Sequence, residues 1–230
     1  MGDEEEKIYK IINLATNVES KSSRDFTGRG RAEYSSGDVY EGEYVSGLRC
    51  GQGKYFYVKG NKYDGRWKDN QKNGVGKFEY NKKGVYFGYF QNGRRHGEGV
   101  FTYVNGDTYS GKWKYGKKHD FGTYLYADSG MKLEGQWDSA KFVKGKWILP
   151  NGVYYEGDFV NNKPNEKGVW YFKSGNNAEG AYTQKKNEED EDEDEDAGPV
   201  EPKVKVKLEW KSRLHLIESA KLIKELPALE

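Results

Sequence analysis

The sequence predicts an all-β protein: an array of about seven consecutive β-hairpins that form an elongated, curved, single-layer antiparallel sheet, with short helical termini. The stretch from Gly97 to Trp113 alternates aromatic residues around an Asn-Gly-Asp turn, which predicts one hairpin. Its Tyr-x-Gly-x-aromatic step recurs at an almost constant interval along the chain. Such a regular period indicates a repeat protein. The copies begin at Tyr40, Tyr63, Tyr86, Tyr109 and Tyr155, with degenerate copies at Leu133 and Ala178.

The other strand of each unit begins with a Gly-x-Gly-x-aromatic step, first seen at Gly28, and the array spans residues 28–182. From Gly122 onward only the second glycine of the step remains. Residues two apart in a strand share a face, so the rings and the glycines lie on one face. Each glycine leaves room for a neighbouring ring and lets the sheet bend. We therefore expect the ring-and-glycine face to be concave.

The composition favours a single-layer sheet and not a conventional two-layer core. The 230 residues have a mean hydropathy of −1.06 and 34% hydrophobic content, which is too polar for two packed layers. The 15% aromatic content and 30 glycines are too rich for a disordered chain. The single cysteine, Cys50, is expected in a loop between repeats, excludes a disulfide framework and suits a reducing compartment.

The segments outside the array form three further parts. Residues 1–27 are a capping or docking segment, in which residues 7–18 place Ile8, Ile11 and Val18 on one face of a predicted helix. Residues 183–202 are an acidic linker that contains the nine-residue acidic run from Glu188 to Asp196. Residues 203–230 are a docking segment, with a strand from Val204 to Trp210 and a helix that reaches Leu226. The acidic N-terminus and the absence of a long apolar run predict a cytoplasmic location without a secretory signal or a membrane span.

No pattern of reactive side chains predicts catalysis. His96 and His119 lie one repeat apart, without the spacing of metal ligands or a nearby nucleophile. The Gly-x-Gly pairs open strands and lack the lysine-serine ending of a phosphate loop. We expect no enzyme activity, cofactor or metal. The basic loops 91–96 and 114–119 read as soluble sheet edges, with an anionic-lipid edge as the alternative; nothing resembles a nucleic-acid-binding module.

The repeated Tyr-x-Gly-x-Trp and Gly-x-Gly-x-Tyr steps resemble MORN repeats. Within that family, residues 97–113, 122–130 and 159–168 are similar to members found in the radial spoke head of ciliary and flagellar axonemes. The resemblance implies a cytoskeletal scaffold that binds other radial spoke head proteins, or a second copy of itself, and contacts central pair projections indirectly. Such a scaffold helps to transmit signals between the central pair and the dynein arms. Other MORN arrays resemble the chain and imply the alternative, a phospholipid-binding or membrane-tethering adaptor.

Two faces of the predicted sheet are candidate binding surfaces. The concave face is expected to hold a polypeptide on its stacked rings, and the alternative is that these rings fill the gaps left by glycines. The middle of this face comprises Tyr63, Trp67, Phe90, Tyr109, Trp113 and Trp137. The opposite face turns apolar from the third hairpin onward, so we expect it to be covered by the 204–226 tail, a second copy or a spoke-head protein. High β-propensity of apolar residues is the alternative explanation. The residues expected in this interface are Phe87, Tyr89, Leu125, Ile148 and Tyr171.

Overall fold

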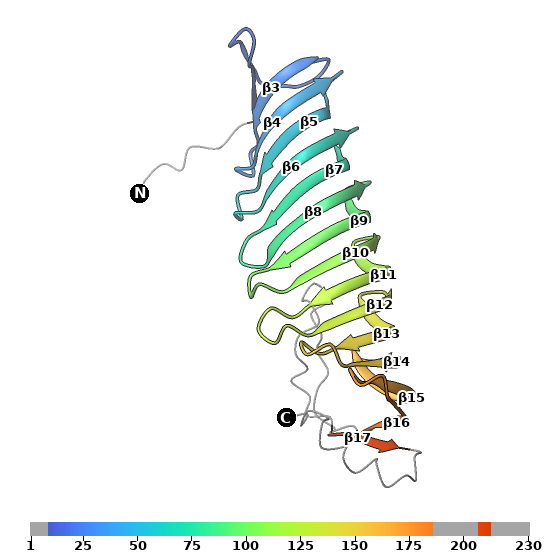
Figure 1. Cartoon of the computed structure of the whole chain (residues 1–230). Helices are drawn as coiled ribbons and strands as arrows, with labels where there is room; N and C mark the ends of the chain where they lie inside the picture. Colours follow the sequence, from blue (N-terminus) through green and yellow to red (C-terminus); the bar gives the residue numbers. More distant parts are fainter. Residues whose placement is uncertain (1–8, 186–206, 213–230) are drawn as a thin grey trace. The chain divides into compact units, whose positions relative to one another are not determined.

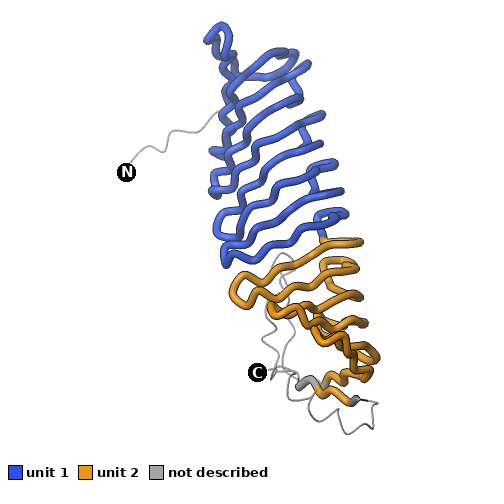
Figure 2. Tube along the Cα trace, in the orientation of Figure 1, with its two compact units in different colours: residues 1–117 blue, residues 118–230 orange. Residues whose placement is uncertain are grey.

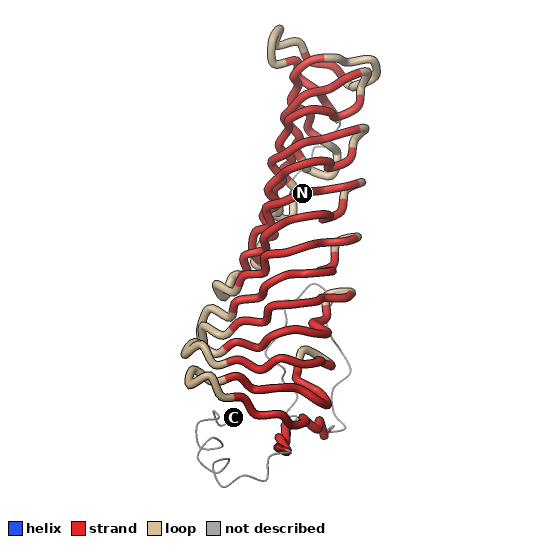
Figure 3. Tube along the Cα trace, turned by 45° about the vertical axis from the view of Figure 1, so that its right-hand side comes forward, coloured by secondary structure: helices blue, strands red, loops and turns tan. Residues whose placement is uncertain are grey.

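The computed structural model describes residues 9–185 and 207–212, and these residues form strands joined by turns. No helix occurs among them (Figure 3). The prediction of an all-β, single-layer antiparallel sheet of consecutive hairpins is confirmed. The chain divides into two compact units, residues 1–117 and 118–230, which are described separately (Figure 2).

Unit 1 is an antiparallel sheet in which each strand from β3 onward pairs with the next along the chain (Figure 1). The N-terminal strand β1 pairs with β3 and also with the short β2. The strands are β1 (Lys10–Asn13), β2 (Glu19–Ser20), β3 (Gly28–Glu33), β4 (Val39–Val45), β5 (Leu48–Phe56), β6 (Lys62–Lys68), β7 (Gln71–Tyr80), β8 (Gly84–Gln91), β9 (Arg94–Tyr103) and β10 (Thr108–Lys114).

Unit 2 follows the same rule, and each of its strands pairs antiparallel with the next. Its strands are β11 (Lys117–Leu125), β12 (Lys132–Asp138), β13 (Lys141–Ile148), β14 (Tyr154–Val160), β15 (Lys163–Tyr171), β16 (Asn177–Lys185) and β17 (Lys207–Ser212). The last strand supplies Trp210, whose ring lies 5.0 Å from that of Tyr182.

Two-residue turns join alternate strands. In unit 1 they are Ser46-Gly47, Asp69-Asn70, Asn92-Gly93 and Tyr115-Gly116, and both residues of each turn have positive φ. Two positive φ values define a type I′ turn, whose twist matches that of the flanking strands. The turns also stack: the backbone N–H of Asn70 donates to the carbonyl of Arg49 at 3.1 Å, and that of Gly93 donates to the carbonyl of Lys72 at 2.9 Å. Successive turns are thereby tied together along the same edge.

The core of each unit is a layer of rings over glycines. Tyr63 illustrates the rule, because its ring lies over the paired glycines Gly65 and Gly76. A Cβ on Gly76 would lie 2.6 Å from Cε2 of that ring, so a larger residue cannot fit without movement. Tyr40, Tyr86 and Tyr155 lie over equivalent glycine pairs. A single-layer sheet thus buries its aromatic residues against its own backbone.

The N-terminal segment differs from its prediction, because the expected helix over residues 7–18 is wrong. Residues 10–13 instead form β1, followed by a turn over 14–16 and then β2. The edge of β3 presents unpaired N–H and C=O groups, which a strand can satisfy and a helix cannot. Ile11, only 1% exposed, covers the first glycine positions with Phe26. The segment therefore covers the end of the sheet, as expected of a cap, but as a strand.

The C-terminal strand was predicted over 204–210 and is found as β17, paired with β16. Residues 204–206, the acidic run and the predicted C-terminal helix lie outside the described residues. Cys50, expected in a loop, lies in β5 opposite Glu43 and is half-buried.

Candidate interaction faces of the sheet

The six aromatic residues predicted to line the ring face all lie on it and are nearly inaccessible. Their exposed fractions are 1% for Tyr63, 6% for Trp67, 3% for Phe90, 0% for Tyr109, 4% for Trp113 and 2% for Trp137. These rings fill the space above the glycines, which is the self-packing interpretation. The role of these rings in binding a partner stays a prediction. A partner would contact the side chains that cover the rings before it contacted the rings.

Hydrogen bonds fix the rings within the core. The hydroxyl of Tyr63 donates to the carbonyl of Arg66 at 2.9 Å, at the bulge that separates Gly65 from Trp67 in the pairing with β7. The indole Nε1 of Trp67 donates to the carbonyl of Gly53 at 3.0 Å. A bulge leaves ladder groups unpaired, so the tyrosine supplies a missing donor. Tyr40, Tyr86 and Tyr109 make the equivalent bond three residues ahead.

Neighbouring repeats interlock through edge-to-face ring pairs. The ring of Tyr63 lies 5.3 Å from that of Trp67 in its own repeat and 5.1 Å from that of Phe90 in the next, at interplanar angles of 83° and 80°. This is the favoured geometry for aromatic rings, because the positive edge of one meets the negative face of the other. Each tyrosine therefore stabilises two repeats at once.

A row of cations, which was not predicted from the sequence, covers the rings of unit 1. Arg49, Lys72 and Arg95 stand one repeat apart, each at the second position after a two-residue turn. The Arg49 guanidinium lies 4.6 Å from the Trp67 ring centroid, and that of Arg95 lies 4.4 Å from Trp113. The Lys72 ammonium lies 4.4 Å from the ring of Phe78. We call these three residues the cation row. Its signal in the sequence was its period, which had been attributed to soluble loops.

The cation row is partly anchored by neutral groups. Arg49 donates from Nη2 to the carbonyl of Asn70 at 3.0 Å, and Arg95 donates from Nη2 to the carbonyl of Gly116 at 2.6 Å. Burial among rings lowers the pKa of Lys72 to about 8, and repulsion from Arg95 and Arg49 contributes to this shift. Like charges therefore lie near one another along the row, and their repulsion disfavours the protonated form of Lys72.

In unit 2 the equivalent positions change from a cation to apolar residues. Lys118, 3% exposed, lies 4.9 Å from the ring of Trp137. The next equivalent residue is Phe142, opposite Trp137, which is fully buried and lies 4.6 Å from the ring of Phe159. Pro164 follows, opposite Phe159, and is also buried. The positive character of the ring face thus belongs mainly to the earlier repeats.

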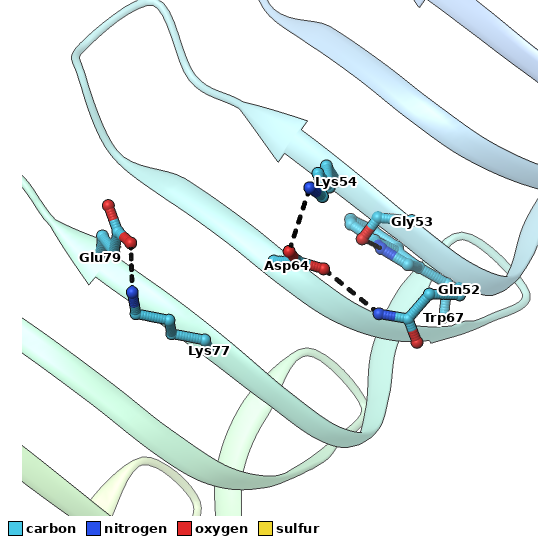
Figure 4. A network of polar contacts seen from close by, with 7 residues as sticks. All are labelled: Gln52, Gly53, Lys54, Asp64, Trp67, Lys77 and Glu79. Carbon is cyan, nitrogen blue, oxygen red and sulfur yellow. Dashed lines mark hydrogen bonds and ion pairs between the residues drawn. The ribbon is translucent and has the colours of Figure 1, made fainter.

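The opposite face of unit 1 carries a network of polar side chains over β5 to β7. Asp64 accepts a hydrogen bond from Gln52 at 3.2 Å and forms an ion pair with Lys54 at 3.5 Å, while Lys77 pairs with Glu79 at 2.6 Å (Figure 4). These side chains are about half exposed, so each pair contributes less than about 1 kcal/mol. The face is solvated here.

The same face becomes apolar over β8. Phe87 is 58% exposed and Tyr89 is 52% exposed. Phe87 lies opposite Val100 of β9, and Tyr89 lies opposite Val75 of β7; Val100 is 39% and Val75 is 37% exposed. We call these four residues the β8 patch. No described residue covers it, so the expected cover stays a prediction.

In unit 2 the three predicted interface residues are half-buried. Leu125 and Ile148 each lie opposite Lys132 of β12, on its two neighbouring strands. Tyr171 stacks on Tyr154 with ring centroids 4.8 Å apart and planes 17° apart. Each of the three therefore lies beside a side chain of a neighbouring strand, which accounts for part of its burial.

Among the described residues, no group of three or more His, Cys, Asp or Glu side chains could hold a metal ion. The described part of the chain also contains no helix of the length and apolarity that crossing a membrane requires.

His119 lies between Asp138, at 3.3 Å from Nδ1, and Asp120, at 3.7 Å from Nε2.

A single layer of hairpins, repeated at a constant interval with its rings over glycines, defines a β-hairpin repeat protein. The chain belongs to the MORN-repeat family: the family model matches residues 40–62, 63–85, 86–108, 109–131 and 155–177, half of the chain. MORN repeats point to a scaffold or to a protein- or lipid-binding role.

No curated protein matches the chain. Two solved structures that it resembles are of the Sas-4 TCP domain of Drosophila melanogaster. One is a complex with a proline-rich motif of Ana2, at 13% identity and a TM-score of 0.36, covering 66% of this chain and 83% of that one. The other has the same identity and TM-score, and covers 65% of this chain and 90% of that one.

Proposed function

We propose that the protein is a non-enzymatic structural scaffold of the axonemal radial spoke head, where it binds other spoke-head proteins. In this role it helps to transmit signals from the central pair to the dynein arms and resides in the cilium or flagellum. The proposal draws on the similarity of residues 97–113, 122–130 and 159–168 to radial spoke head protein 1.

The single structural observation that supports a scaffold is the β8 patch. Its four side chains are 37% to 58% exposed, whereas the ring face of the sheet is buried. Contiguous exposed apolar side chains on a soluble sheet mark a surface for another protein. One face of the sheet holds the buried rings that stabilise the fold, and the other face presents apolar side chains. Such a sheet can bind several proteins side by side.

The experiment is fractionation of ciliated cells that express the tagged chain. Axonemes are stripped of membrane with detergent and the radial spokes are then extracted with salt. We expect the chain to remain with the axonemes, to be extracted with the spokes, and to capture spoke-head proteins on affinity purification. Release of the chain with the membrane fraction would contradict the proposal.

The second candidate is a phospholipid-binding or membrane-tethering adaptor, which the basic side chains of the ring face favour. Pelleting with phosphatidylserine vesicles over a series of salt concentrations tests it. Vesicle binding that falls with salt and is lost on substitution of Arg49 and Arg95 by Gln would support this candidate.

A further inference from the structure

We propose that a row of half-buried tyrosines on the ring face of unit 1 binds a proline-rich segment of a partner protein. The segment lies across the strands as a polyproline II helix, with acidic residues between its prolines. This inference rests on the proposed scaffold role and names the chemistry of one partner. We call these side chains the tyrosine row; they are Tyr34, Tyr57, Tyr80 and Tyr103.

The tyrosine row recurs once per repeat at one position of the sheet. Each member follows a buried residue of the ring face by two positions, so it lies on the same face. Tyr57 follows Tyr55, for example, and Tyr80 follows Phe78. These buried residues belong to one row of paired positions that crosses the sheet from β3 to β9. Two strands therefore separate successive members, a spacing of about 9.5 Å.

Buried rings alternate with the tyrosine row and hold it in place. The ring centroid of Tyr57 lies 4.4 Å from that of Tyr55 and 5.7 Å from that of Phe78. Tyr80 lies in the same way 4.2 Å from Phe78 and 5.6 Å from Phe101. A ligand would therefore meet partly exposed rings whose positions are already fixed, which lowers the entropy cost of binding.

The spacing of the tyrosine row matches a polyproline II helix. Such a helix has three residues per turn and rises about 3.1 Å per residue, so every third side chain returns to one side after about 9.3 Å. A β-strand returns a side chain to one side after about 6.7 Å, and its third residue points away. An α-helix needs seven residues, about 10.5 Å, and loses about 1 Å of register per repeat. Proline-rich segments bind aromatic side chains in the polyproline II conformation.

Two cations beside the tyrosine row favour acidic residues in the bound segment. The guanidinium of Arg49 lies 5.9 Å from the ring centroid of Tyr34, and the ammonium of Lys72 lies 5.9 Å from that of Tyr57. Within residues 9–185 and 207–212, neither cation forms an ion pair with a carboxylate. An acidic residue next to a proline would bring a carboxylate within reach of each cation, where a charged hydrogen bond is strong.

Two other occupants fit the tyrosine row less well. Nucleic-acid bases stack on open ring faces, whereas the ring of Tyr57 already packs against those of Tyr55 and Phe78. The chain itself contains five prolines, and only Pro199 and Pro202 have the three-residue spacing. These two would meet at most two of the four tyrosines. We therefore assign the row to a partner with a proline at every third position.

The test uses the full chain and three fluorescent synthetic peptides of equal length. The spaced peptide repeats Pro-Ala-Glu four times. The clustered peptide has the same composition with its prolines contiguous, and the third peptide has Ala in place of Pro. Fluorescence anisotropy measures binding at several salt concentrations. We expect the spaced peptide to bind at least about fivefold more tightly than the other two, with an affinity that falls as salt rises.

Substitutions locate the binding. Tyr57→Leu keeps an apolar side chain and removes the flat ring, so we expect it to weaken binding about tenfold. Tyr57→Phe keeps the ring and should bind within about twofold of the unmodified chain. Phe56→Leu is the matched control, because Phe56 is adjacent in sequence, is 39% exposed and lies on the opposite face. This control should bind like the unmodified chain.

Two further variants complete the set. Tyr80→Leu repeats the test one hairpin later and should also weaken binding about tenfold. Arg49→Gln should weaken binding and reduce its dependence on salt, because it removes one charge beside the row. Thermal melts of each variant verify that it is folded.

Four outcomes would overturn the inference. They are equal binding by the unmodified chain and a folded Tyr57→Leu or Tyr80→Leu variant, equal affinity for the spaced and clustered peptides, binding of a single-stranded oligonucleotide in place of the peptide, and at least tenfold tighter peptide binding once Pro199 and Pro202 are replaced by Ala. The last would identify the chain's own segment as the occupant. Failure of the spaced peptide to bind, with intact capture of spoke-head proteins, would remove this inference alone. Peptide binding without axonemal association would remove the proposed scaffold role alone.

Discussion

The ring of Tyr63 lies over the backbone of Gly76, where a Cβ would come within 2.6 Å of ring atom Cε2 and 2.7 Å of Cζ. Gly76 is therefore glycine because of its neighbour, and its φ is not in the left-handed region. The glycines therefore recur in the sequence with the same period as the tyrosines whose rings lie over them.

The first prediction is that Gly76→Ala destabilises the chain by about 1–3 kcal/mol, because the added methyl overpacks the ring of Tyr63. Urea unfolding measures the change. Gly93→Asn is the control: nothing lies within 4 Å of its Cβ position and Asn is among the residues that best tolerate a positive φ, so its effect should stay below about 1 kcal/mol. Equal costs at the two sites would contradict the role of the ring.

The second prediction compares the two faces of the sheet. Trp67→Ala should cost about 3–5 kcal/mol, because it leaves a cavity in the core and removes the ring against which Arg49 lies. Phe87→Ala should change stability by less than about 0.5 kcal/mol, because Phe87 is 58% exposed. Thermal and urea unfolding of both variants provide the comparison, and a large cost at Phe87 would mean that its face is covered within the chain.

The third prediction concerns the β8 patch in complex formation. Phe87→Glu combined with Tyr89→Ser should leave the isolated chain folded and abolish capture of the protein that covers this face. Lys62→Glu, an exposed residue on the polar part of the same face, is a charge control. Unchanged capture by the double variant would show that the patch is bare in the assembly.

The fourth prediction is a rise in stability above neutral pH that depends on Lys72. The pKa of Lys72 is about 8 in the folded chain and about 10.5 when unfolded, so the unfolded chain binds more protons between these values. Stability therefore increases with pH in this window, by at most about 2 kcal/mol between pH 7 and pH 9.5. Urea unfolding across this range should show the rise in the unmodified chain and not in Lys72→Met.

The fifth prediction is that stability then falls above about pH 10. Burial raises the pKa of Tyr40, Tyr63 and Tyr86 well above the ordinary value, so only the unfolded chain releases these protons at that pH. The part of the phenolate absorbance that comes from these three buried tyrosines should appear together with loss of the β-sheet circular dichroism signal. Ionisation of these tyrosines in a chain that remains folded would contradict the burial of their hydroxyl groups.

The array was predictable from the sequence because each hairpin repeats the same local rules. Alternation placed the rings and glycines on one face, and the turn residues set the spacing. The N-terminal helix was wrong because Ile8, Ile11 and Ile12 fit a helical face, while the deciding factor was the open edge of β3, which is a tertiary constraint.

The cation row was harder to predict, because Arg49 and Arg95 sit beside turn residues in sequence and basic residues there are usually solvated. Their direction depends on the type I′ turn: β9 begins at Arg94, three residues earlier than a loop over residues 91–96 assumes. The sequence indicated that the opposite face becomes apolar at Phe87 and Tyr89. Whether these residues are covered depends on partner molecules, which the sequence does not identify.

Pairing only between strands that follow one another along the chain, from β3 through β10, has a consequence for how the molecule folds. Each strand finds its partner after a short connection, so little loop entropy is lost for each pairing. All-β domains usually fold slowly because their pairings are distant in sequence. Folding of this sheet can begin at any hairpin and extend in both directions, so ordered structure can form behind the ribosome one repeat at a time while the rest of the chain is still being made.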